Sequence, residues 1–127
     1  MKVEIPVAIG ELFDKISILN VKKSRISDYP SVTTILHELS LLHIIAQKID
    51  RQYFETKEYK KLFEVNDTLF VIEDSIRAFE KAKQFDENFI ELARRVYLQN
   101  DKRAKIKSTI NLIYNSDITE VKTYQKY

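Results

Sequence analysis

The chain has 127 residues, of which 44% are hydrophobic and 31% charged, a composition that fits one folded domain and excludes intrinsic disorder. One glycine and two prolines are too few for a turn-rich β-sandwich or barrel, and the lack of cysteine excludes disulfides, thiolate metal sites and thiol catalysis. A net charge of +2 does not argue for nucleic acid, and no apolar run reaches the roughly 18 residues of a membrane span.

The first part of the chain predicts an extended arm followed by two helices. Residues 2–8 favour extended backbone. From Ile9 the apolar residues recur at helical spacing, which predicts a helix over about 9–26. Pro30 disfavours helix at the residue before it and suits the first turn of the next helix, which we expect over about 31–53.

The second part predicts two longer helices and a polar tail. A helix is expected over about 57–83, with Thr56 as its N-cap, and another should start after Asp86 and continue to about Tyr114. Four long helices with short connections favour an all-α antiparallel bundle that forms a single domain over residues 1–127. The second and fourth helices are broadly apolar, so we also expect a homodimer.

Polar side chains occupy the apolar stripes of the third and fourth helices. Glu73 falls on the stripe of the third helix. Asn100, Arg103, Lys107 and Asn111 fall on that of the fourth. Because buried charges are tolerated only when paired, we expect Glu73 to be partly buried and ion-paired with Arg103 or Lys107. Three interpretations remain open: a structural ion pair, long side chains that reach past the stripe to water, or a polar cleft for an anionic ligand.

Charged residues also gather on one face of the first helix, opposite its main apolar stripe. Glu11 and Lys15 have the spacing of an ordinary surface ion pair, so a solvated face is the simplest interpretation. Glu11 and Asp14 could instead act together on a metal ion or a proton, as carboxylates on bundle helices do. The two histidines are six residues apart, which is not the spacing of a helical zinc pair, and we expect no metal and no cofactor.

Four blocks of the sequence resemble, in order, those of a family of small uncharacterised bacterial proteins that share a domain of unknown function. The opening block, Gly10-Glu11-Leu12-Phe13-Asp14-Lys15 followed by Ile18-Leu19, resembles a Gly-Glu-Leu-x-Asp-Lys-x-x-Ile-Leu signature. The others are Ile72-Glu73-Asp74-x-Ile76-Arg77, a long block from Phe89 through Tyr97, Asn100-Asp101 and Arg103 to Asn111, and a closing element of Ser116 and Glu120-x-Lys122-x-Tyr124. The resemblance implies no activity.

We therefore expect a cytoplasmic binding module and leave catalytic activity open. It would bind a small anionic ligand or a partner protein through a charged cleft between helices. Neither a membrane nor nucleic acid is expected as a partner, because the basic stretch 94–107 suits a solvated helix surface in a nearly neutral chain. The candidate cleft residues are Glu11, Asp14, Lys15, Glu73, Asp74, Arg77, Arg94, Asn100, Asp101, Arg103 and Lys107.

Two enzyme interpretations stand beside this one. The first is a magnesium-dependent enzyme similar to the all-helical nucleoside-triphosphate pyrophosphohydrolases, in which helix carboxylates hold the metal. A sequence that resembles those enzymes has a Glu-x-x-Glu motif followed later by a Glu-x-x-Asp motif. Here Glu11-x-x-Asp14 comes before Glu55-x-x-Glu58, so the two motifs stand in the wrong order. The second is a helical enzyme similar to chorismate mutase, for which the sequence offers no specific motif.

Overall fold

The computed structural model describes residues 1–127 and contains four α-helices, one short 3-10 helix and no strand. The helices are α1 (Ile9–Arg25), α2 (Tyr29–Ile49), α3 (Lys57–Lys81) and α4 (Glu87–Ile113), with the 3-10 helix η1 (Tyr53–Glu55) ahead of α3. The predicted all-α architecture is confirmed, with an arm before α1 and a tail, residues 115–127, after α4. The largest difference from the prediction is the end of α2, which stops at Ile49 instead of continuing to residue 53. No helix has the length and apolarity that crossing a membrane requires.

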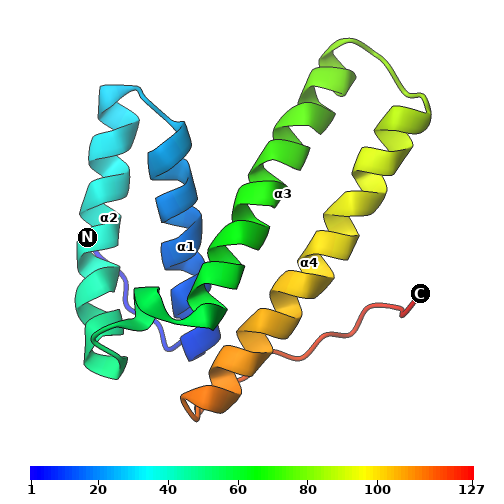
Figure 1. The fold of residues 1–127 in the computed structure, drawn as a ribbon. Coiled ribbons are helices and arrows are strands. Elements are labelled where there is room, and N and C mark those ends of the chain that lie inside the picture. Colours follow the sequence, from blue (N-terminus) through cyan, green and yellow to red (C-terminus); the bar gives the residue numbers. More distant parts are fainter.

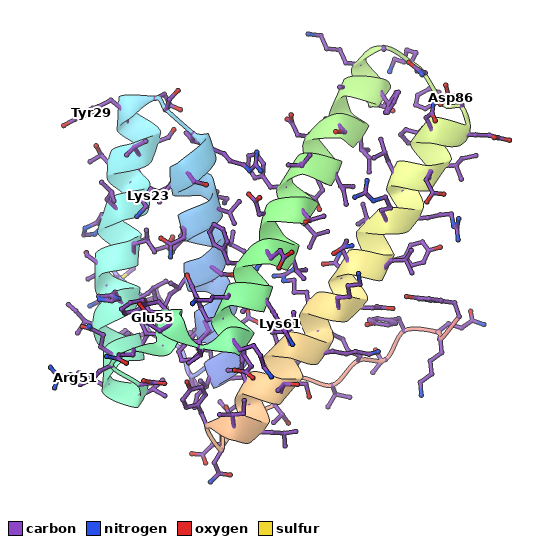
Figure 2. All side chains as sticks on the ribbon, viewed as in Figure 1. Lys23, Tyr29, Arg51, Glu55, Lys61 and Asp86 are labelled. Carbon is purple, nitrogen blue, oxygen red and sulfur yellow. The ribbon has the colours of Figure 1, made fainter.

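Side-chain caps fix the starts of three helices. Asp28 caps α2, Thr56 caps α3 and Asp86 caps α4, and each side chain accepts a hydrogen bond from the backbone N–H three residues later. The predicted roles of Thr56 and Asp86 are thus confirmed, and Figure 2 shows Asp86 at the turn where α4 begins. The start of α1 is different, because Ala8 in the capping position has no side-chain acceptor.

The central element of the fold is α1, which contacts all three other long helices, whereas α2 contacts only α1 and η1 (Figure 1). Consecutive helices run antiparallel, and the α1–α2 pair diverges from the α3–α4 pair in a V-shaped outline. At the end of α1, Arg25 pairs with Asp67 and lies over the ring of Phe70. Beyond this level, only α4 lies beside α3 (Figure 1).

The hydrophobic core lies where the helices converge, near the start of α1. Phe13, Ile16, Leu62 and Ile110 come from three different helices and are completely buried. Tyr53 of η1 stacks on the Phe13 ring with the centroids 5.2 Å apart. Full burial of each such side chain is worth about 1.5–3 kcal/mol, so this cluster fixes α1 against both α3 and α4.

Candidate functional site

A cluster of buried polar side chains joins α1, α3 and α4. Asp14 and Ser17 of α1 are completely buried, and Asn66 of α3 and Lys107 of α4 are also buried. The Asp14 carboxylate accepts hydrogen bonds from Arg103 Nε at 2.9 Å, from Arg103 Nη2 at 2.5 Å and from the Asn66 amide at 2.9 Å. Bidentate pairs of this kind are among the strongest hydrogen bonds in proteins. No buried side-chain nitrogen or oxygen lacks a partner, so the cluster is internally satisfied.

Lys107 connects this cluster to the tail. Its Nζ lies 2.7 Å from Glu11 Oε2, 3.2 Å from Glu120 Oε2 and 3.9 Å from Asp14 Oδ2. Burial disfavours the charged amine, but the hydrogen bond to Glu11 and the Asp14 charge outweigh it and raise the pKa of Lys107. The hydrogen bond from Lys122, together with that from Lys107, lowers the pKa of Glu120. Both partners are therefore charged at neutral pH.

The start of α1 is held by side chains from the end of α4 and from the tail. The Ile9 N–H donates to Ser116 Oγ at 3.0 Å, and the Gly10 N–H donates to Asn111 Oδ1 at 2.7 Å. These bonds satisfy donors that a helix N-terminus leaves free. A Cβ on Gly10 would lie 2.5 Å from the Lys107 carbonyl oxygen, so the contact between α1 and α4 requires glycine here.

The tail runs back along α4 and is anchored a second time at Asp101 (Figure 1). The Tyr124 hydroxyl donates to Asp101 Oδ1 at 3.0 Å, and the Tyr127 hydroxyl donates to the other carboxylate oxygen. The Tyr127 ring also packs edge-on against Tyr97, with centroids 5.2 Å apart. The hydrogen bond to Asp101 raises the pKa of Tyr124 and raises that of Tyr127 to about 12. The tail is thus held at the levels of both Lys107 and Asp101.

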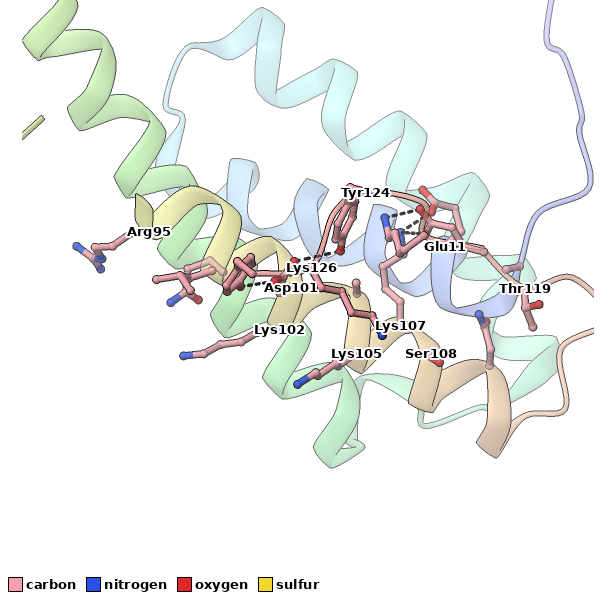
Figure 3. Close-up of a pocket in the computed structure, with 18 residues that line it drawn as sticks. Glu11, Arg95, Asp101, Lys102, Lys105, Lys107, Ser108, Thr119, Tyr124 and Lys126 are labelled. Carbon is pink, nitrogen blue, oxygen red and sulfur yellow. Dashed lines mark hydrogen bonds and ion pairs between the residues drawn. The ribbon is translucent and has the colours of Figure 1, made fainter. Parts of the chain in front are cut away.

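A groove of about 720 Å³ lies between α4, the tail and the start of α1 (Figure 3). Its charged lining comprises six bases and three acids, namely Arg95, Lys102, Lys105, Lys107, Lys122, Lys126, Glu11, Asp101 and Glu120. The acids are engaged by Lys107, Lys122 or tyrosine hydroxyls. Four bases, Arg95, Lys102, Lys105 and Lys126, form no ion pair. The groove, referred to below as the tail groove, therefore presents uncompensated positive charge.

The structure brings together six of the eleven predicted cleft residues, which are Glu11, Asp14, Asn100, Asp101, Arg103 and Lys107. They surround the ion-pair cluster and the tail groove rather than a cleft bounded by α3. The other five lie elsewhere. Lys15 pairs with Glu38 at the surface and Arg94 pairs with Glu91, whereas Glu73, Asp74 and Arg77 are exposed and form no ion pair.

The predicted pair between Glu73 and Arg103 or Lys107 is wrong. Glu73 is exposed, because it lies beyond Asp67, which pairs with Arg25 at the end of α1, so α1 does not extend to its level. Arg103 pairs with Asp14 instead. A groove of about 440 Å³ between α3 and α4 does exist and includes Lys61, labelled in Figure 2, but it contains none of the predicted residues of α3.

Some members of the site carry only a weak signal in the sequence. Asn66 lies on the same apolar stripe as Glu73, and that position is the signal for its burial. Ser17 has no signal of its own, because a serine on a helix is most often solvated. Glu120 and Tyr124 belong to the closing block of the family resemblance, but their contacts with Lys107 and Asp101 depend on the path of the tail.

The two carboxylates considered for metal binding are already occupied. Glu11 is bound by Lys107, and Asp14 is bound by Arg103. These cationic groups take the positions in which a magnesium ion would be coordinated. No group of three or more His, Cys, Asp or Glu side chains could hold a metal ion. The first-helix carboxylates therefore serve as ion-pair partners in this arrangement.

Comparison with known proteins yields one match. No curated protein and no solved structure matches the chain. The model of one family matches residues 1–127, and the description of that family assigns no function. The family that the sequence blocks resemble likewise has no assigned function. The chain thus belongs to the family of unknown function DUF6165.

Proposed function

We propose that this protein is a non-catalytic module that binds a small anionic ligand in the tail groove. The observation that carries the proposal is the set of four basic side chains that line the groove without an acidic partner: Arg95, Lys102, Lys105 and Lys126. Concave surfaces lined by one sign of charge concentrate ligands of the opposite sign. The volume of about 720 Å³ lies within the range of about 300–1,000 Å³ typical of small-molecule sites.

The placement of these bases favours a ligand with several negative charges. Arg95, Lys102 and Lys105 lie along one side of α4, and ten residues of helix span about 15 Å. A single carboxylate or phosphate would meet only one or two of these groups. A chain of phosphates, or a diphosphate joined to a second charged group, would meet all three. Lys126 of the tail would approach such a ligand from the other wall of the groove.

Calorimetric titration with inorganic tripolyphosphate at low salt tests the proposal. We expect binding that weakens as salt is added, and at least about tenfold weaker binding by the Lys102→Gln/Lys105→Gln variant, because its two substitutions remove two charged contacts. The matched control is Lys57→Gln/Lys60→Gln, which removes the same charge from exposed, unpaired lysines of α3 outside the groove. Absence of binding, or equal weakening in the control, would contradict a specific site.

The magnesium-dependent enzyme is not proposed, because its chemistry requires carboxylates that are free to coordinate the metal. Glu11 and Asp14 are held by Lys107 and Arg103. Releasing them would leave buried cations without partners, which is costly. In the paired arrangement Glu11 and Lys107 line the tail groove as an ion pair.

A further inference from the structure

Helix α2 lies at the edge of the fold and leaves an apolar surface uncovered. It packs only on α1 and η1, through Ile35, Leu39 and Ala46. On another side of the helix Ile44 is 57% exposed and Ile45 48% exposed. Apart from two histidines, the 21 residues of α2 include only two charged side chains, Glu38 and Lys48. An exposed helix of this composition is typical of a surface that another molecule covers.

The uncovered side of α2 carries the spacing of a helix-packing seam. Glu38, Leu41, Ile45 and Lys48 follow one another at intervals of three, four and three residues. This is the alternation by which two helices interlock along their length. Leu41 is half-buried in the single chain, and the other three line the seam around it.

The seam is complementary to itself when two copies run antiparallel. Leu41 of one copy then lies opposite Ile45 of the other, and Glu38 lies opposite Lys48. Both pairs are centred on position 43, so one two-fold axis at the level of His43 satisfies them together. In a parallel arrangement Glu38 would face Glu38 and Lys48 would face Lys48, and both contacts would be repulsive.

We propose that α2 forms the interface of a two-fold symmetric homodimer in which the α2 helices of two chains pack antiparallel across an axis at the level of His43. Such an interface uses the same surface on both subunits. Lys15, whose Nζ lies 3.3 Å from Glu38, sits at its rim. A contact between two helices about 30 Å long is smaller than the roughly 800 Å² per partner of a standard interface, so we expect micromolar affinity. This proposal is independent of the tail groove.

Sedimentation equilibrium of the full chain tests the apolar part of the seam. We expect a monomer–dimer equilibrium for the wild type, with a dissociation constant below about 500 µM. Ile45→Glu should associate at least about a hundredfold more weakly, because it places two charges at the centre of the contact. The matched control is Val71→Glu on α3, where the original side chain is 44% exposed, and it should dimerise like the wild type. A monomeric wild type, or a control as dissociated as Ile45→Glu, would overturn the proposal.

A charge exchange tests the antiparallel register. Lys48→Glu alone should weaken the dimer about tenfold, because each of two attractive contacts becomes repulsive. Adding Glu38→Lys to the same chain reverses both partners and should restore association to within about threefold of the wild type. A double variant no stronger than Lys48→Glu would refute the register.

Discussion

Removing either member of the Asp14–Arg103 pair should destabilise the fold, and the two removals should differ. Breaking a buried ion pair costs about 3–5 kcal/mol because one charge remains without its partner. Asp14→Ala leaves Arg103, whose side chain is 27% exposed and can turn to water, so we expect about 3 kcal/mol. Arg103→Ala leaves a completely buried carboxylate with Asn66 and the more distant Lys107, so we expect about 4–5 kcal/mol.

Urea unfolding followed by far-UV circular dichroism measures these losses as changes in the free energy of unfolding. The double variant Asp14→Ala/Arg103→Ala should cost at least about 2 kcal/mol less than the two single losses added together, because it leaves neither charge stranded. Glu73→Ala is the control and should stay within about 0.5 kcal/mol of the wild type, since Glu73 is exposed and unpaired. Single losses below about 1 kcal/mol, or strictly additive ones, would refute the assignment of this pair as the structural link between α1 and α4.

Two further predictions concern the contacts around α1 and the tail. Gly10→Ala should lower the free energy of unfolding by about 1–3 kcal/mol, because the new Cβ meets the Lys107 carbonyl oxygen and α1 must move away from α4; an unchanged urea midpoint would contradict this. The tail contact between Glu120 and Lys107 should be complete from about pH 4.5 to about pH 10.5, since the pKa of Glu120 lies below its usual 4.5 and that of Lys107 above its usual 10.5. It should be lost as the pH falls through the lowered Glu120 pKa or rises through the raised Lys107 pKa. The methyl signals of Val121, the non-titrating neighbour of Glu120, should move toward free-peptide values in NMR outside this window, and signals that stay constant down to about pH 2 would speak against the contact.

The positions of the helices can be predicted from the sequence because helix-forming and capping patterns are local. The start of α1 at Ile9 follows from the spacing of its apolar residues, and the starts of α3 and α4 follow from the caps Thr56 and Asp86. The end of α2 could not be predicted, because Tyr53 follows Ile49 at helical spacing while the backbone has already left the helix at Asp50. There Tyr53 is buried in the core from η1, a tertiary position that periodicity cannot distinguish from one more helical turn.

The candidate site could be predicted only in part, because a helical wheel gives the direction of a side chain and not its partner. It correctly marked Lys107 and Asn111 as polar residues on a buried stripe. It assigned Asp14 to a face expected to be solvated, but α1 has neighbours on three sides and Asp14 is completely buried. It predicts burial of Glu73, which lies farther along its stripe than α1 extends. How deeply a given turn of a helix is buried depends on where the helices cross, and the sequence pattern of a single helix does not indicate where they cross.

The capping of α1 from the far end of the chain has a consequence for biosynthesis. The backbone N–H groups of Ile9 and Gly10 find their acceptors on Ser116 and Asn111, which follow 107 and 101 positions later. At about 5–20 residues per second, a ribosome needs roughly 5–20 s to add those residues. During that interval the nascent α1 has free N–H groups and an Asp14 carboxylate without Arg103. Within residues 1–127, α1 therefore precedes the other helices in the chain but is the last to be capped, and its native contacts are complete only after residues 111 and 116 have been added.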